Sequence, residues 1–178
     1  MKFASSVLLL TVASGAYSFV IQRDLKAITG VLTAVQGDID GLDNALKGWT
    51  NDPKSTLDAA NKLIATIKAG SGTVSGSEPL QLADATQLLK PVQELKSHAQ
   101  TLVNDLKGKK DQIQTQGLCD VVRGEIGDIN TDSKSLIDAT VSKVPEAAQG
   151  IAKEQAQGII DVLNDATQAF SADNCKNA

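Results

Sequence analysis

The residues that could carry acid–base or metal chemistry are few in this chain of 178 residues. His98 is its single histidine, which excludes a metal site built from several imidazoles and leaves one imidazole as a general base. Helical periodicity places His98 about 80° from the centre of an apolar stripe, at the edge of a buried face. A histidine in that position is usually structural, so we expect no metal site and no catalytic histidine.

Pairs of carboxylates offer a second route to catalysis. Asp38 and Asp40 form one such pair, and Asp128 and Asp132 form another. On helices these positions fall on polar faces beside lysines, which is typical of solvated surface charge. The Gly-x-Ser-x-Gly nucleophile elbow is also absent from the sequence. The sequence therefore predicts that the protein is not an enzyme and has no cofactor.

A glycine-rich segment, residues 69–77, reads Ala-Gly-Ser-Gly-Thr-Val-Ser-Gly-Ser. A phosphate-binding loop would need a preceding strand and a third glycine at the right spacing. Here a helical pattern precedes the segment, and the third glycine comes one residue too late. We therefore interpret residues 69–77 as a flexible connector, although the apolar stripe of the preceding helix could extend to Val74.

The two cysteines, Cys119 and Cys175, are predicted to form a disulfide. Cys119 opens one helical pattern and Cys175 follows the next, and the two patterns are joined by a short turn at Val144-Pro145. A short turn makes these helices antiparallel, which brings both cysteines to the same end. Unpaired thiols are also rare in an oxidising compartment.

The first 16 residues have the layout of a secretory signal peptide. Lys2 supplies the positive charge, residues 7–13 form a short apolar run, and small residues follow at positions 14–16. The run is far shorter than the roughly 20 residues that a bilayer requires. We expect cleavage after Ala16, a single domain over residues 17–178, no transmembrane segment, and a secreted, extracellular location.

The rest of the chain shows five long helical patterns and no convincing strand. Apolar residues recur at steps of three and four over residues 21–49, 57–67, 82–117, 122–144 and 145–170. Asn51-Asp52-Pro53 is a typical helix start, and Pro91 should kink the third pattern. Short loops between long amphipathic helices predict an all-α fold, a single up-and-down bundle.

The composition limits the partners and describes the interior. The net charge of −4 argues against nucleic-acid binding, and aromatic residues make up only 3% of the chain. Small side chains recur at inward positions of the helical patterns: Ala60, Ala99, Ser133, Thr140, Ala148 and Ala166. Such helices either pack tightly or leave a central apolar channel. The pattern alone favours tight packing.

The order of several short segments resembles a known family over the whole mature chain. These segments are 38–46 in the first helix, Asp52-Pro53, Leu80–Ala85, Lys90–Leu95, Lys109-Lys110-Asp111 and Ser142–Pro145. In this order and spacing they resemble the fungal hydrophobic-surface-binding protein and cell-wall galactomannoprotein family. The resemblance implies a secreted or wall-associated helical bundle that binds lipid.

Two functions follow from the resemblance. The first is a lipid-binding protein that encloses fatty acids, of the arachidonic or palmitic type, in an apolar channel of the bundle. The second is a protein that adsorbs to hydrophobic surfaces or the cell wall and recruits a secreted hydrolase. Longer wall-bound members carry a Ser/Thr-rich tail that this sequence lacks, so free secretion and association with the cell wall both remain open.

If acyl chains lie along the bundle axis, aliphatic residues in the middle of the helices should line the channel. The predicted lining residues are Val35, Ile39, Ile64, Ile67, Val92, Leu95, Ile126, Ile129 and Val162. A kink at Pro91 would widen the interior beside Val92.

Overall fold

The computed structural model describes residues 14–178, with side chains from residue 24, and every regular element in that range is a helix. The helices are α1 (Ser14–Gly48), α2 (Lys54–Ser75), α3 (Leu82–Gln87), α4 (Leu89–Gly108), α5 (Lys110–Thr115), α6 (Cys119–Lys143) and α7 (Glu146–Ala169). Five of them are long, which confirms the predicted all-α bundle. Residues 1–13 of the predicted signal peptide lie outside the described range, so that prediction stays untested.

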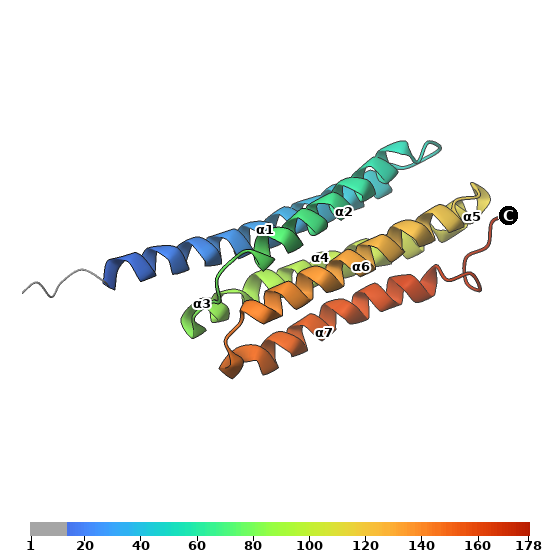
Figure 1. Cartoon of the computed structure of the whole chain (residues 1–178). Coiled ribbons are helices and arrows are strands. Elements are labelled where there is room, and N and C mark those ends of the chain that lie inside the picture. The colour runs from blue at the N-terminus through green and yellow to red at the C-terminus, as the bar shows by residue number, and fades with distance from the viewer. Residues whose placement is uncertain (1–13) are drawn as a thin grey trace, which may run out of the picture.

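The long helices run side by side, with α3 at one end of the bundle and α5 at the other (Figure 1). We call the end that carries α5 and the two cysteines the disulfide end, and the opposite end the α3 end. Successive long helices run in opposite directions, as predicted for an up-and-down bundle. Short connections impose this alternation because each helix must turn back along the one before it.

The five long helices close into a ring. Each packs against two others, in the order α1, α2, α6, α7, α4 and back to α1. Long helices that follow each other in the chain are therefore not always neighbours in the ring. For example, α2 packs against α1 and α6, whereas α4 packs against α1 and α7. The short helix α3 carries the chain across one end of the ring, from α2 to α4, and α5 carries it across the other end, from α4 to α6. The ring leaves a centre that only side chains can fill.

The start of α2 follows the predicted pattern. Asp52 Oδ1 accepts a hydrogen bond from the backbone N–H of Lys54 at 2.9 Å. Pro53 precedes the first helical residue and has no N–H of its own to satisfy. The segment Asn51-Asp52-Pro53 therefore begins the helix as expected, because the Asp52 carboxylate accepts from a free N–H of the first turn and Pro53 adds no further N–H that needs a partner.

The third predicted helix, residues 82–117, is divided into α3, α4 and α5. The first break is at Leu88, one turn before Pro91. Pro91 has no N–H to donate to the carbonyl of Gln87, so the helical hydrogen bond that would span Leu88 is missing. The predicted kink thus takes the form of a break, and Pro91 lies in the first turn of α4, where free N–H groups are normal.

The glycine-rich segment is helical up to Ser75, so its interpretation as a connector was wrong. Gly70 is buried, and a Cβ atom there would lie 2.5 Å from Cγ1 of Val31. Glycine at this position therefore allows α1 and α2 to approach closely. Val74 is fully buried. Packing against α1 offsets the roughly 1 kcal/mol that each glycine costs a helix, and the stripe extends to Val74.

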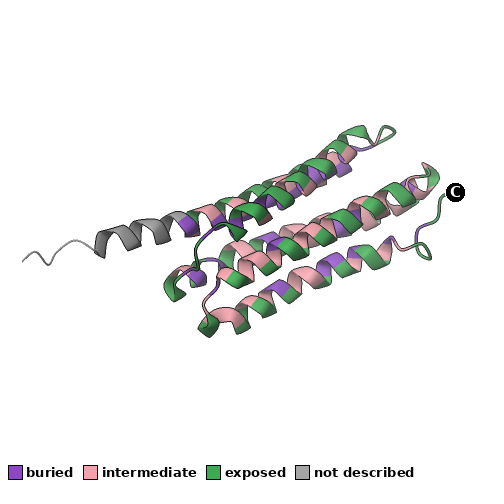
Figure 2. Ribbon diagram, viewed as in Figure 1, coloured by how far each residue is buried: buried purple, intermediate pink, exposed green. Residues whose placement is uncertain are grey.

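Buried residues follow the inner faces of the helices (Figure 2). One cluster packs α1 against α2 and α4 and contains Ile28 and Leu63, each 1% exposed or less. A second cluster lies toward the disulfide end and contains Trp49, Ile113 and Phe170. Within the described range, no helix combines the length and apolarity that crossing a bilayer requires.

Candidate functional site

The centre of the helix ring contains a cavity lined almost wholly by aliphatic side chains. Its volume, counted as space open to the centre of a water-sized molecule, is about 220 Å³. All five long helices and α3 contribute to its wall. All six small inward residues of the sequence pattern line it: Ala60, Ala99, Ser133, Thr140, Ala148 and Ala166. The cavity exists because these short side chains, with no aromatic ring among the lining residues, do not fill the centre of a five-helix ring.

Eight of the nine predicted lining residues lie in the cavity wall: Val35, Ile39, Ile67, Val92, Leu95, Ile126, Ile129 and Val162. Ile64 does not. It is half-buried, and Leu63 lines the cavity in its place. The two residues are about 100° apart on α2. Steps from Ala60 through either of them to Ile67 fit a helical stripe equally well, so the spacing could not separate them.

The cavity is long and narrow. Along α1 its lining runs from Leu32 to Leu46, which at a rise of about 1.5 Å per residue is about 21 Å. Two of its lining residues, Thr86 on α3 and Ile151 on α7, are exposed. Since α3 packs against α7, the cavity reaches the surface at the α3 end. This role of α3 was not predicted, because the apolar periodicity indicated a single helix over residues 82–117.

The wall holds two polar groups with unmet hydrogen bonds. Thr56, in the first turn of α2, is 9% exposed, and its Oγ1 has no partner. Glu125 on α6 is half-buried, and its Oε2 is buried and also without a partner. Burial raises the pKa of Glu125 above its ordinary value, and the negative charge of Asp128 raises it further. Neither residue was predicted to line the cavity. The signal for Glu125 is its position three residues after Val122 and four before Ile129, within an apolar stripe.

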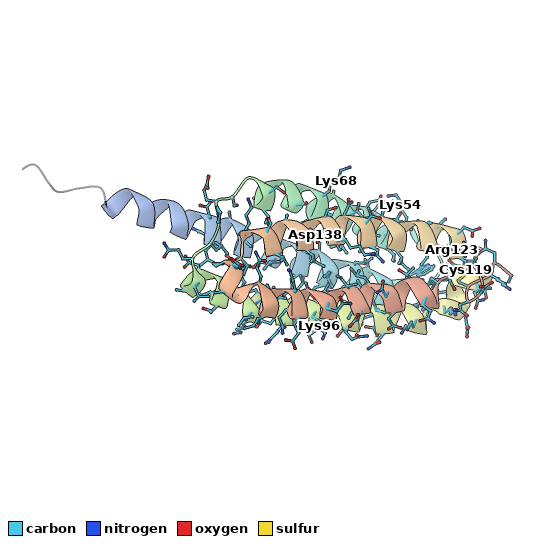
Figure 3. All side chains as sticks on the ribbon, turned by 60° about the horizontal axis from the view of Figure 1, so that its bottom comes forward. Lys54, Lys68, Lys96, Cys119, Arg123 and Asp138 are labelled. Carbon is cyan, nitrogen blue, oxygen red and sulfur yellow. A yellow bond between two sulfur atoms is a disulfide. The ribbon has the colours of Figure 1, made fainter. Side chains whose placement is uncertain are left out.

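The other polar lining residues are Thr86, Ser133, Thr140 and Gln155. Thr140 Oγ1 donates to the carbonyl of Leu136 at 2.8 Å, and Thr86 Oγ1 donates to that of Ala83 at 2.7 Å. No lysine, arginine or histidine occurs among the described lining residues. Lys54, Lys68, Lys96 and Asp138 lie on the outside of the bundle instead (Figure 3).

His98 lies outside the cavity wall and joins α4 to α1. Its Nδ1 is 2.5 Å from Oδ1 of Asp40, and its Nε2 is 3.1 Å from Nε2 of Gln36. Its side chain is 37% exposed. These contacts fit the predicted structural role at the edge of the apolar stripe. Asp38 accepts hydrogen bonds from Lys62 and Thr66 on α2, so the Asp38 and Asp40 carboxylates face different helices.

The predicted disulfide is present. Cys119 and Cys175 are bonded, with their Cα atoms 5.6 Å apart. Arg123 lies beside the bridge (Figure 3) and donates to the backbone carbonyls of Phe170 and Cys175, at 3.0 and 3.1 Å. The C-terminal segment is thereby fixed to the start of α6. Among the described residues, no group of three or more histidine, cysteine, aspartate or glutamate side chains is placed to hold a metal ion.

Comparison with known proteins gives one family and several relatives. The family model described as "Hydrophobic surface binding protein A" matches residues 25–142. Proteins described as "Cell wall mannoprotein 1" from Aspergillus fumigatus and Aspergillus flavus are 28% and 25% identical to this chain, over 96% of its length. The chain spans only 60% and 63% of those two relatives.

Solved structures share the fold. Ligand binding domain 1 of Penicillium marneffei MP1 protein, complexed with arachidonic acids, matches with a TM-score of 0.80 at 23% identity. The match covers 84% of this chain and 99% of that one. AFMP4P in complex with palmitic acid matches with a TM-score of 0.77 at 20% identity, over 83% of this chain and 99% of that one. At these identities the likeness establishes the fold.

Proposed function

The chain belongs to the hydrophobic surface binding protein A family, and on this premise we propose that it binds fatty acids of the palmitic or arachidonic type inside the bundle. The observation that carries the proposal is the long aliphatic cavity at the centre of the helix ring. Domains of the same fold have been solved with arachidonic and palmitic acids. The eight predicted lining residues that face the cavity would contact the acyl chain.

The energetics of enclosing an acyl chain are favourable. Removing about 14 methylene groups from water, at roughly 0.8 kcal/mol each, contributes about 11 kcal/mol gross. Association and ordering of the chain cost several kcal/mol. The remainder corresponds to micromolar or tighter binding. A cavity about 21 Å long, by the helical rise, suits one extended chain rather than a compact ligand.

Native mass spectrometry and titration calorimetry of the delipidated protein test this function. We expect added palmitic acid to give a discrete complex and a saturable heat, with a dissociation constant in the micromolar range or below. The native mass spectrum of protein purified without delipidation should show a non-covalently bound ligand whose mass matches a fatty acid. The absence of any complex with palmitic or arachidonic acid would contradict the proposal.

Adsorption to a hydrophobic surface is a second candidate function, favoured by two exposed side chains. Leu82 on α3 and Ile151 on α7 are 51% and 53% exposed, and α3 packs against α7. These residues would place an apolar patch at the cavity mouth. Replacing both by serine should reduce adsorption to polystyrene. Val121→Ser is the matched control, because Val121 is exposed on α6 at the opposite end. Equal adsorption of both variants would contradict this role.

We also propose that the chain is secreted as a single domain that is not an enzyme. The relatives are described as cell wall mannoproteins, which supports an extracellular or wall location. Cleavage after Ala16 would leave Tyr17 at the N-terminus, and N-terminal sequencing of protein from the culture medium tests that expectation. An intact N-terminus or purely cellular protein would contradict it.

A further inference from the structure

Thr56 differs from every other helical threonine whose side chain the structure describes. The others each donate a hydrogen bond, most of them to the backbone carbonyl four residues earlier in the same helix; the bonds of Thr73, Thr131 and Thr140 are examples. Thr56 is the third residue of α2, so no helical carbonyl lies four residues before it. Its hydroxyl is buried at the cavity wall and unpartnered. A buried hydroxyl without a partner costs about 1–3 kcal/mol.

Glu125 lies at the same level of the bundle as Thr56. The parallel helices α2 and α6 are neighbours in the ring, and near the α3 end Lys143 Nζ donates to the carbonyl of Ser75. Thr56 lies as many residues before Ser75 as residue 124 lies before Lys143. Because both helices rise by the same distance per residue, Thr56 is level with residue 124. Leu136, only about 20° from Glu125 in projection, belongs to the core cluster shared with α2, so Glu125 is on the α2 side of α6. Two unsatisfied polar groups on adjacent helices thus lie at the same level of the cavity wall, toward its disulfide end.

The chemistry of this polar end disfavours a carboxylate. The described cavity wall contains no cationic side chain, so an ionised head group would be buried without a counter-charge. Glu125 Oε2 is a hydrogen-bond acceptor that lacks a donor, and the Thr56 hydroxyl can donate. A head group that donates to Glu125 and accepts from Thr56 would satisfy both groups.

We propose that Thr56 and Glu125 form a head-group site that selects long-chain lipids with an O–H donor, such as an alcohol or an un-ionised fatty acid. With both side chains turned toward the cavity, the ligand O–H donates to the Glu125 carboxyl group, and the Thr56 hydroxyl donates to a ligand oxygen. The head group then lies at the disulfide end, and the acyl chain extends past Val92 toward the mouth at the α3 end. This selection rests on the proposed lipid-binding function and specifies which lipids the cavity takes.

Three ligands of equal chain length separate the head groups. They are 1-hexadecanol, palmitic acid and methyl palmitate, each measured by displacement of a fluorescent fatty-acid probe from the delipidated protein. The ester can accept a hydrogen bond but cannot donate one. We expect the alcohol to bind about tenfold tighter than the ester, the size of one well-placed hydrogen bond. Palmitic acid should bind between the two, because it must enter in its un-ionised form.

Two substitutions test the named residues. Glu125→Leu should reduce the preference for alcohol over ester to within about twofold, because it removes the acceptor of the ligand O–H. Thr56→Val should weaken the binding of both ligands by about threefold and leave the preference unchanged, because alcohol and ester can both accept from Thr56. Neither variant should melt below the wild type in the absence of ligand, because each removes a buried polar atom that has no partner. Thr140→Val is the matched control, because that hydroxyl lines the same cavity but already bonds the carbonyl of Leu136. It should leave the preference unchanged.

The outcomes separate this site from the function it rests on. Equal affinity of the wild type for all three ligands would overturn the site while leaving lipid binding intact. A preference that survives Glu125→Leu but disappears in Gln155→Leu would overturn it too, because Gln155 lines the cavity near the α3 end. Failure of any ligand to displace the probe would refute the lipid-binding function itself. Tight binding of 1-hexadecanol without binding of palmitic acid would support the site and would show that the protein binds long-chain alcohols rather than fatty acids.

Discussion

The two ends of the bundle are held together in different ways. At the disulfide end, the Cys119–Cys175 bridge and the hydrogen bonds of Arg123 fix the last turn of the fold to α6. Phe170 is completely buried there, as is Ile113. Lys109 donates to the carbonyl of Trp49, which ties α5 to the loop after α1.

The α3 end has fewer such ties. Lys143 joins α6 to α2 through its contact with Ser75, and its own carbonyl accepts from the N–H of Leu80. Leu82 and Ile151 are more than half exposed, and the cavity opens beside them. The difference indicates that stability is concentrated at one end of the bundle and access to the interior at the other. Four predictions test this contrast.

The largest expected effect is on stability at the disulfide end. Phe170→Ala should lower the free energy of unfolding by about 3–5 kcal/mol, because it leaves a cavity where a fully buried ring was. Leu82→Ala at the α3 end should change it by less than about 0.5 kcal/mol, since the side chain is half exposed. Urea denaturation of both variants measures the contrast. Similar losses for the two would mean that stability is spread evenly.

Loss of the disulfide should come next. Replacing Cys119 and Cys175 by serine should cost about 4 kcal/mol in the chain-entropy model, for a bridge that spans 56 residues. Fatty-acid affinity, measured below the new melting temperature, should stay within a few-fold of the wild type because neither cysteine lines the cavity. A loss of affinity much larger than this would show that the bridge itself is needed to hold the ligand site in shape.

Val92→Trp tests the opposite end. Val92 lies in the first turn of α4 and lines the cavity. An indole there should occupy the ligand's space and weaken fatty-acid binding about a hundredfold or more, a loss of about 2.7 kcal/mol. Melting temperature should change little, because the cavity can accept the ring. In a tightly packed core the same change would cost 1–3 kcal/mol.

The same measurements on Val121→Trp provide the control, since Val121 is exposed on α6 and does not line the cavity. Both its melting temperature and its fatty-acid affinity should match the wild type. A Val92→Trp protein that is strongly destabilised yet still binds fatty acid would contradict the cavity as the ligand site.

The smallest effects are expected at His98. His98→Ala removes the contacts with Asp40 and Gln36, which are partly exposed and should contribute no more than about 1 kcal/mol to stability. Fatty-acid affinity should remain within a few-fold of the wild type, because His98 does not line the cavity. Calorimetric titration with palmitic acid checks this. A hundredfold weaker variant that is still folded would place His98 at the ligand.

The five long helices, the disulfide and the aliphatic character of the interior could be predicted from the sequence, but the breaks that divide residues 82–117 into α3, α4 and α5 were reduced to a kink at Pro91. Apolar residues at steps of three and four specify an amphipathic helix wherever it packs. The short turn at Val144-Pro145 makes α6 and α7 antiparallel, which brings Cys119 and Cys175 together. Local geometry is sufficient for these features.

The order of the helices in the ring and the contents of the cavity wall depend on tertiary packing. The spacing on α2 allowed either Leu63 or Ile64 to face inward, and the choice depends on which helices flank α2. Thr56 and Glu125 lie level on adjacent helices only because α2 and α6, separated by three helices in the chain, are neighbours in the ring. Pairings between distant helices depend on how side chains pack across the whole bundle, and a periodic pattern within one helix carries no information about them.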